Sequence, residues 1–153
     1  MKNELKKIQE YLESDEVDFE YIEKEDLLLV PIMSHEEKTI FESIGIRYDL
    51  IYIQITIQFT NVFSNDLKYR LSEYLHRANY DMIRGSFEYN VDENIISFKH
   101  YFENSVISNK NYTIYNVILP AMMFKKYMSG IPDIFETDIS TKEIIDKIEE
   151  NDK

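Results

Sequence analysis

The sequence predicts an α+β fold, in which an antiparallel sheet of about five strands has its helices packed on one face. Three observations predict it. One nine-residue segment alternates apolar and polar side chains, two shorter alternating segments flank a turn, and several stretches repeat apolar residues at helical spacing. Strands joined by short turns, with helices at intervals, are typical of this class. The expected order is α-β-β-β-α-β-β-α, followed by a short C-terminal helix.

The chain opens with an amphipathic segment. Leu5 and Ile8 recur at helical spacing among lysines and glutamates, which predicts a helix over residues 3–13. Extended chain follows as far as Pro31, whose missing N–H favours a strand end or an edge position. Gly45, further on, is expected to mark a bend or a bulge.

The strongest pattern is the alternation over residues 51–59. A period of two places one set of side chains on each face of a strand. The apolar set is Ile51, Ile53, Ile55, Ile57 and Phe59, and the polar set is Tyr52, Gln54, Thr56 and Gln58. This predicts a half-buried strand of an antiparallel sheet whose second face is wet or only partly covered.

A second helix and a hairpin are expected next. Ser64 has the side chain to cap a helix, with Asp66 in its first turn, and apolar residues recur at helical spacing up to Ala78. Residues 87–91 and 96–102 then alternate on either side of turn-forming residues, which predicts a β-hairpin.

Residues 113–129 allow two interpretations because Pro120 lies within a helical pattern. Either one kinked helix starts near Thr113, or an extended piece precedes a helix that has Pro120 at its first position. We favour the kinked helix. Gly130 and Pro132 provide a stop signal after it.

The end of the chain reads as an addition. Ser140-Thr141-Lys142-Glu143 matches a capping box that opens a short acidic helix. Residues 136–153 are expected to form an acidic helical extension appended to a single domain over residues 3–135.

Composition limits the classes of function. The net charge is −12, with −6 in residues 1–26 and −5 in residues 133–153. Such a field opposes binding to nucleic acid and to anionic membranes, and we expect neither as a partner. The negative charge keeps the protein soluble, or it attracts a basic protein partner. There are no cysteines, which excludes disulfides and thiol chemistry and favours a cytoplasmic location.

The residues suited to catalysis do not form a motif. His35 lacks the second histidine of a zinc-protease helix, and residues 35–39 are expected to be a polar loop. His76 is expected on a helix surface. His100 alternates with phenylalanines, which predicts a partly buried histidine with a hydrogen-bond partner. With three glycines in the chain there is no phosphate loop. We therefore expect no catalytic residue, no metal site and no cofactor.

Protein binding is the remaining chemistry. Tyr52, Gln54 and Thr56 fall on the outward face of the alternating strand, where tyrosine suits an interface or simply pairs across strands. Met122 and Tyr127, on the predicted helix over residues 113–129, complete the set of residues expected to contact another protein.

Residues 74–80 (Tyr-Leu-His-Arg-Ala-Asn-Tyr), 85–90 (Gly-Ser-Phe-Glu-Tyr-Asn) and 95–98 (Ile-Ile-Ser-Phe) resemble the YbjN family. The order of elements is also similar to that of type III secretion chaperones. The resemblance covers about residues 3–135, with residues 74–98 its distinctive part. It implies a non-enzymatic module that pairs into dimers and holds segments of client proteins.

Two functions are therefore expected. The first is a protein-binding module, a chaperone-like or regulatory adaptor that acts as a homodimer. The alternative is an acidic immunity-type inhibitor that masks a basic toxin or nuclease, with affinity drawn from complementary charge.

Overall fold

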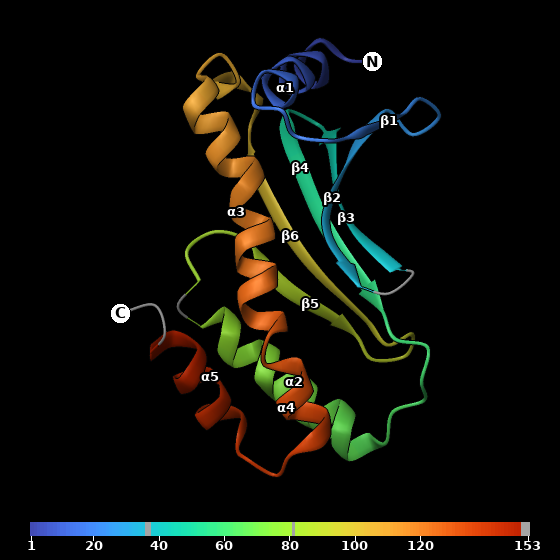
Figure 1. Cartoon of the computed structure of the whole chain (residues 1–153), viewed down its shortest axis with the longest axis vertical. Helices are drawn as coiled ribbons and strands as arrows, with labels where there is room; N and C mark the ends of the chain where they lie inside the picture. The colour runs from blue at the N-terminus through green and yellow to red at the C-terminus, as the bar shows by residue number, and fades with distance from the viewer. Residues whose placement is uncertain (36–37, 81, 151–153) are drawn as a thin grey trace.

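The fold is seen in a computed structural model that describes residues 1–35, 38–80 and 82–150 (Figure 1). Six antiparallel strands form one sheet in the order β1-β2-β3-β4-β6-β5. In chain order the elements are α1 (Asn3–Ser14), β1 (Glu20–Ile22), β2 (Leu27–His35), β3 (Lys38–Arg47), β4 (Leu50–Gln58), α2 (Asn65–Asn79), β5 (Ser86–Asn90), β6 (Ile95–Glu103), a 3-10 turn (Asn104–Val106), α3 (Lys110–Met128), α4 (Ile131–Glu136) and α5 (Thr141–Glu150). The predicted α+β class is confirmed.

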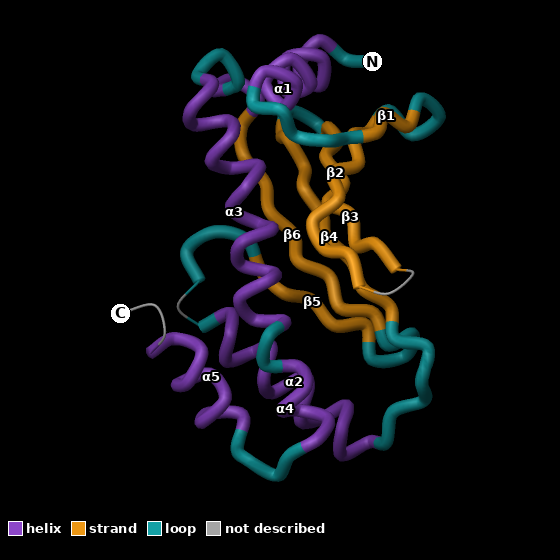
Figure 2. Tube along the Cα trace, in the orientation of Figure 1, coloured by secondary structure: helices purple, strands orange, loops and turns teal. Residues whose placement is uncertain are grey.

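The two faces of the sheet differ in burial, as β4 shows. We call the buried side the dry face and the solvent-exposed side the wet face. Ile51, Ile53 and Ile55 are fully buried, whereas Tyr52 is only half-buried and Thr56 is exposed. The predicted alternation is therefore confirmed. The helices cover the dry face, with α1 near one end of β4 and α3 running along β6 (Figures 1 and 2).

Two apolar clusters share the dry face. One joins α1 to the sheet through residues such as Leu5, Leu28 and Ile53. The other lies beneath α2, α3 and α5 and includes Tyr74 and Phe98. Burial of these side chains is the main favourable term that holds helices and sheet together.

Local capping signals fix where the helices begin. Ser64 Oγ accepts a hydrogen bond from Leu67 N at 3.2 Å, as predicted. Helix α3 begins three residues before the expected Thr113, because Asn109 Oδ1 accepts from the backbone N–H of Tyr112 at 3.1 Å. It continues without a break past Pro120, so the favoured single helix is confirmed and the alternative of a strand followed by a helix is wrong.

The last helix packs as part of the domain core. The capping box forms as predicted, since Glu143 N donates to Ser140 Oγ at 3.2 Å and Ser140 N donates to Glu143 Oε2 at 3.0 Å. Ile144 and Ile145 are buried in the same cluster as Tyr74. Residues 136–153 are thus an extension in sequence, but α5 docks on α2 rather than standing apart.

A close approach at Gly130 makes this docking possible. A Cβ at this position would lie 2.5 Å from Tyr74 Oη and 2.8 Å from Ile148 Cδ1. The stop signal ends α3 as expected, but the chain then turns directly into α4, a helix that the sequence did not predict. Arg70 holds the connection to α5 by donating to the carbonyl oxygens of Ile134 and Ile139 at 2.8 and 2.5 Å.

The irregularity in the sheet lies in β2 and not at Gly45. The register shifts between Pro31 and Met33, whereas Gly45 pairs regularly with Tyr52. The expected bulge at Gly45 is therefore wrong. The backbone of residue 35 belongs to β2 rather than to a loop, and residues 36–37 lie outside the described part of the chain.

One carboxyl group is buried on the dry face. Glu42 is 1% exposed, and its cross-strand neighbours are Val30 and Ile55, one from each apolar cluster. Its Oε1 has no hydrogen-bond partner among the described residues. Burial raises the pKa of Glu42 from its ordinary value of 4.5 to about 8. The folded chain therefore holds this carboxyl protonated at neutral pH.

We predict that Glu42→Gln stabilises the domain in a pH-dependent way. Because the folded pKa is raised, wild-type Glu42 costs no stability below pH 4.5, and the cost grows until about pH 8. At pH 8 the variant should be more stable by on the order of 3 kcal/mol, from about 1.4 kcal/mol per pH unit less the cost of a buried amide. Urea unfolding at pH 4, 6 and 8 measures the difference. A difference that stays constant with pH would contradict the assignment.

Candidate functional site

Three of the predicted residues gather on the wet side of the sheet. We call this the open sheet face and define it by Tyr52, Gln54 and Thr56 of β4 and by Ser97, Lys99 and Tyr101 of β6. Gln54 Nε2 donates to Thr56 Oγ1 at 2.8 Å, and Thr56 Oγ1 lies 3.1 Å from Ser97 Oγ. The structure thus brings the predicted strand residues together in one hydrogen-bonded array.

Aromatic rings complete the open sheet face. The ring centroids of Tyr52 and Tyr101 are 5.1 Å apart, and the Arg47 guanidinium carbon lies 4.7 Å from the Tyr52 centroid. Tyr101 is 42% exposed. Lys99 pairs with Glu88 at 2.5 Å, so both signs of charge are present. The tyrosine rings and the neighbouring arginine are residue types that are enriched at protein interfaces.

Met122 lies on the opposite side of the molecule. It belongs to what we call the outer α3 face, the exposed side chains of Tyr115, Ile118 and Met122. These residues are 52%, 46% and 58% exposed. Helix α3 lies over the dry side of the sheet, so this face is separated from Tyr52 by the core (Figure 1).

Tyr127 does not share that surface, and the prediction that it would contact a partner is corrected. Its ring is 5% exposed and packs edge-on against Phe87, with centroids 5.8 Å apart. Its hydroxyl donates to Glu149 at 3.2 Å. Helix α3 is apolar on most of its circumference, so its pattern could not distinguish the buried side from the exposed side.

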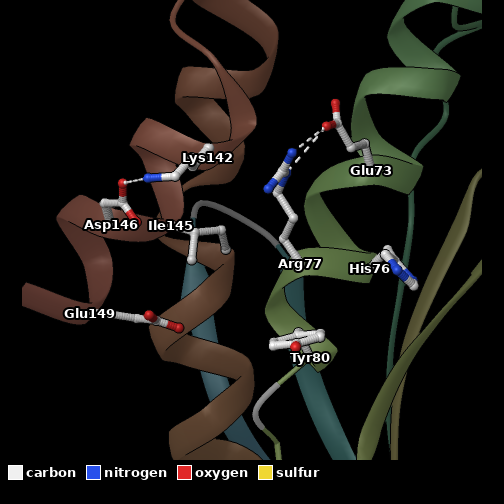
Figure 3. A pocket seen from close by; sticks show the side chains of 8 residues that line it. All are labelled: Glu73, His76, Arg77, Tyr80, Lys142, Ile145, Asp146 and Glu149. Carbon is white, nitrogen blue, oxygen red and sulfur yellow. Dashed lines mark hydrogen bonds and ion pairs between the residues drawn. The ribbon is translucent and has the colours of Figure 1, made fainter.

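A groove of about 440 Å³ lies between α2 and α5 (Figure 3). Its charges are largely paired with one another. Arg77 binds Glu73 at 2.8 Å and donates to Thr141 Oγ1 at 3.0 Å, and Lys142 binds Asp146 at 2.6 Å. We interpret this groove as the seam that joins α5 to α2. His76 lines it but makes none of these contacts.

His100 is a core histidine. It is 4% exposed, and its Nε2 lies 3.0 Å from Asn116 Oδ1. Asn116 Nδ2 donates to Tyr112 O at 2.8 Å, which turns Oδ1 toward the histidine as an acceptor. Burial lowers the pKa of His100 and so favours the neutral ring. The predicted hydrogen-bond partner is confirmed, and the histidine is buried more deeply than the partly buried position that was predicted.

The described residues contain no group of three or more histidine, cysteine or carboxylate side chains placed to hold a metal ion. No helix within them has the length and apolar character needed to cross a bilayer.

The distinctive stretch at residues 74–98 forms a structural clasp between α2 and β5. Asn79 Oδ1 accepts from Phe87 N at 2.8 Å, and Asn79 Nδ2 donates to Phe87 O at 2.9 Å. The side-chain amide thus pairs with the edge strand as a neighbouring strand would. Gly85 has a φ of +76°, and a Cβ there would lie 2.6 Å from Phe98 Cε1. This turn therefore requires glycine.

The crystal structure of YbjN from E. coli, described as a candidate transcription regulator, has a similar fold. The match has a TM-score of 0.59 at 10% sequence identity and covers 78% of this chain and 84% of that chain. No family model matches the sequence, and no curated protein matches it. The expected YbjN-like fold is confirmed at the level of architecture.

We predict that Asn79→Ala destabilises the domain by about 2 kcal/mol, because it leaves a donor and an acceptor of the Phe87 backbone without their partner. Urea unfolding measures the loss. Asn65→Ala, at the exposed start of α2, is the matched control and should change stability by less than about 0.5 kcal/mol. Equal effects of the two substitutions would show that the clasp contributes nothing special.

Proposed function

We propose that this chain is a non-enzymatic protein-binding module, a chaperone-like or regulatory adaptor that acts as a homodimer in the cytoplasm. The observation that carries the proposal is the presence of two uncovered surfaces on opposite sides of one sheet. The open sheet face offers paired aromatic rings and balanced charge, and the outer α3 face offers apolar side chains. A module with two such surfaces has one available for self-association and one for a partner.

The open sheet face is the better candidate for self-association. A twofold interface brings the same patch of each copy together, so it must be complementary to itself. Positive Arg47 and Lys99 and negative Glu88 lie on or beside this face, which allows opposite charges to meet across a twofold axis. Exposed tyrosine adds area at a small entropic cost.

Pairing through the sheet edges is less suitable. At one edge Asn79 already occupies the backbone groups of Phe87 in β5. At the other edge, β1 pairs with β2 only from Leu27 to Leu29. Beyond that stretch β2 contains Pro31, and its register with β3 shifts between Pro31 and Met33. Proline and bulges both discourage a strand edge from pairing. These features support face-to-face rather than edge-to-edge association.

The immunity-type alternative has weaker support. An inhibitor that masks a basic protein would gather its acidic residues on one surface. Here the acidic residues 15–26, which lead into β1, and the acidic α5 lie toward opposite ends of the molecule (Figure 1). A cognate basic protein encoded by a neighbouring gene would favour the alternative again.

Light scattering after size exclusion tests the homodimer. We expect a mass of about twice 18.4 kDa at micromolar concentration. Tyr101→Lys should raise the dissociation constant of the dimer by about tenfold or more, because it removes a tyrosine ring from the interface and adds a cation beside Lys99. Tyr69→Lys, on the 74% exposed side chain of α2, is the matched control and should leave the dimer unchanged. A strict monomer at high micromolar concentration would refute the homodimer.

A further inference from the structure

The segment from Asn104 to Pro132 differs in charge from the rest of the chain. It contains three lysines and neither aspartate nor glutamate, although the whole chain carries 29 acidic residues. Helix α3 lies entirely within this segment. The outer α3 face therefore belongs to a segment that contributes no carboxylate side chain.

The outer α3 face is followed by a positively charged side chain, Lys125, toward the C-terminal end of the helix. Tyr115, Ile118, Met122 and Lys125 follow one another at spacings of three, four and three residues, which places them along one stripe of the helix. Lys125 is exposed and lies about 15 Å along the helix from Tyr115.

A second cation stands at the other end of the stripe. The Arg84 guanidinium carbon lies 5.7 Å from the ring centroid of Tyr115 and 5.8 Å from that of Tyr112. Its NH1 also reaches Asn116 Oδ1 at 3.5 Å. No carboxylate among the described residues forms an ion pair with it. Because Asn116 is itself held by His100, these contacts hold the guanidinium at the end of the apolar stripe.

We propose that the outer α3 face, with Arg84 at one end and Lys125 at the other, is a docking surface for an acidic amphipathic segment of a partner protein. This inference rests on the proposed protein-binding function and names the chemistry of the partner. The matching segment has apolar side chains at helical spacing for Ile118 and Met122. Its carboxylates stand about 15 Å apart to meet the two cations.

A second copy of this chain fits the surface less well. In an antiparallel pairing of two α3 helices, Lys125 of one copy would approach Arg84 of the other, and like charges across an interface oppose association. The amphipathic helices α1 and α5, of which α5 is acidic, already bury their apolar sides within the domain. The partner segment therefore comes from a different protein.

The test uses a fluorescein-labelled peptide of about 18 residues, with leucine at helical spacing and glutamate elsewhere, a length at which a helix can form. A scrambled peptide of the same composition is the control probe. Fluorescence anisotropy with the full chain should show binding of the amphipathic peptide that weakens as salt increases. Since the protein carries a net charge of −12, nonspecific attraction cannot supply this binding.

Substitutions locate the binding. Met122→Glu should weaken it by about tenfold or more, and Met122→Lys by less, because both remove the thioether but only glutamate repels the peptide. Arg84→Gln should weaken it several-fold, and Arg84→Lys should recover part of the loss. Val62→Glu, at a 96% exposed side chain, adds the same charge as Met122→Glu and should leave affinity within about twofold of wild type.

The docking proposal would be overturned if the amphipathic peptide did not bind at high micromolar concentration, or if the scrambled peptide bound equally well. It would also be overturned if Met122→Glu left the binding unchanged. Stronger binding to anionic lipid vesicles than to the peptide would also overturn it in favour of a membrane surface. Light scattering of the same variants separates the two proposals, because Met122→Glu should leave the homodimer intact.

Discussion

The alternation along β4 is the constraint on which the rest of the molecule depends. Because Ile51, Ile53 and Ile55 all point to one side, every helix that packs on the sheet must lie on that side. Six strands and the helices then make two layers, and both outer surfaces remain uncovered. The hydrophobic pattern that drives folding thereby also decides where a partner can bind.

Features that depend only on neighbouring residues were predicted correctly from the sequence. The alternation in β4, the cap at Ser64 and the capping box at Ser140 each act through the nearest turn or neighbouring strand, and each appears as expected. The start of α3 was missed because Asn109 lies outside the hydrophobic pattern. The burial of Tyr127 was missed because the orientation of an almost wholly apolar helix depends on its tertiary contacts.

Two features of the molecule were missed from the sequence. Glu42 lies two residues from both Ile40 and Ile44, a spacing that places it on their face of β3, but a lone carboxylate is usually assigned to the surface. Arg84 lies in a loop, and its tyrosine neighbours come from α3, about thirty residues further on. The clasp at Asn79 shows the converse. Asn79 lies in the stretch that suggested a binding family, yet its contacts with Phe87 are explained by the packing of α2 against β5 alone.

The separation of the acidic ends has a consequence for the kinetics of encounter. Residues 15–26 and residues 133–153 carry nearly all of the net negative charge, and the chain around β1 lies far from α5, with α3 running between these two ends. For a partner that carries the proposed acidic segment, repulsion at these two ends would disfavour approach there relative to approach along α3. The charge distribution would then narrow the range of productive orientations before any contact is made.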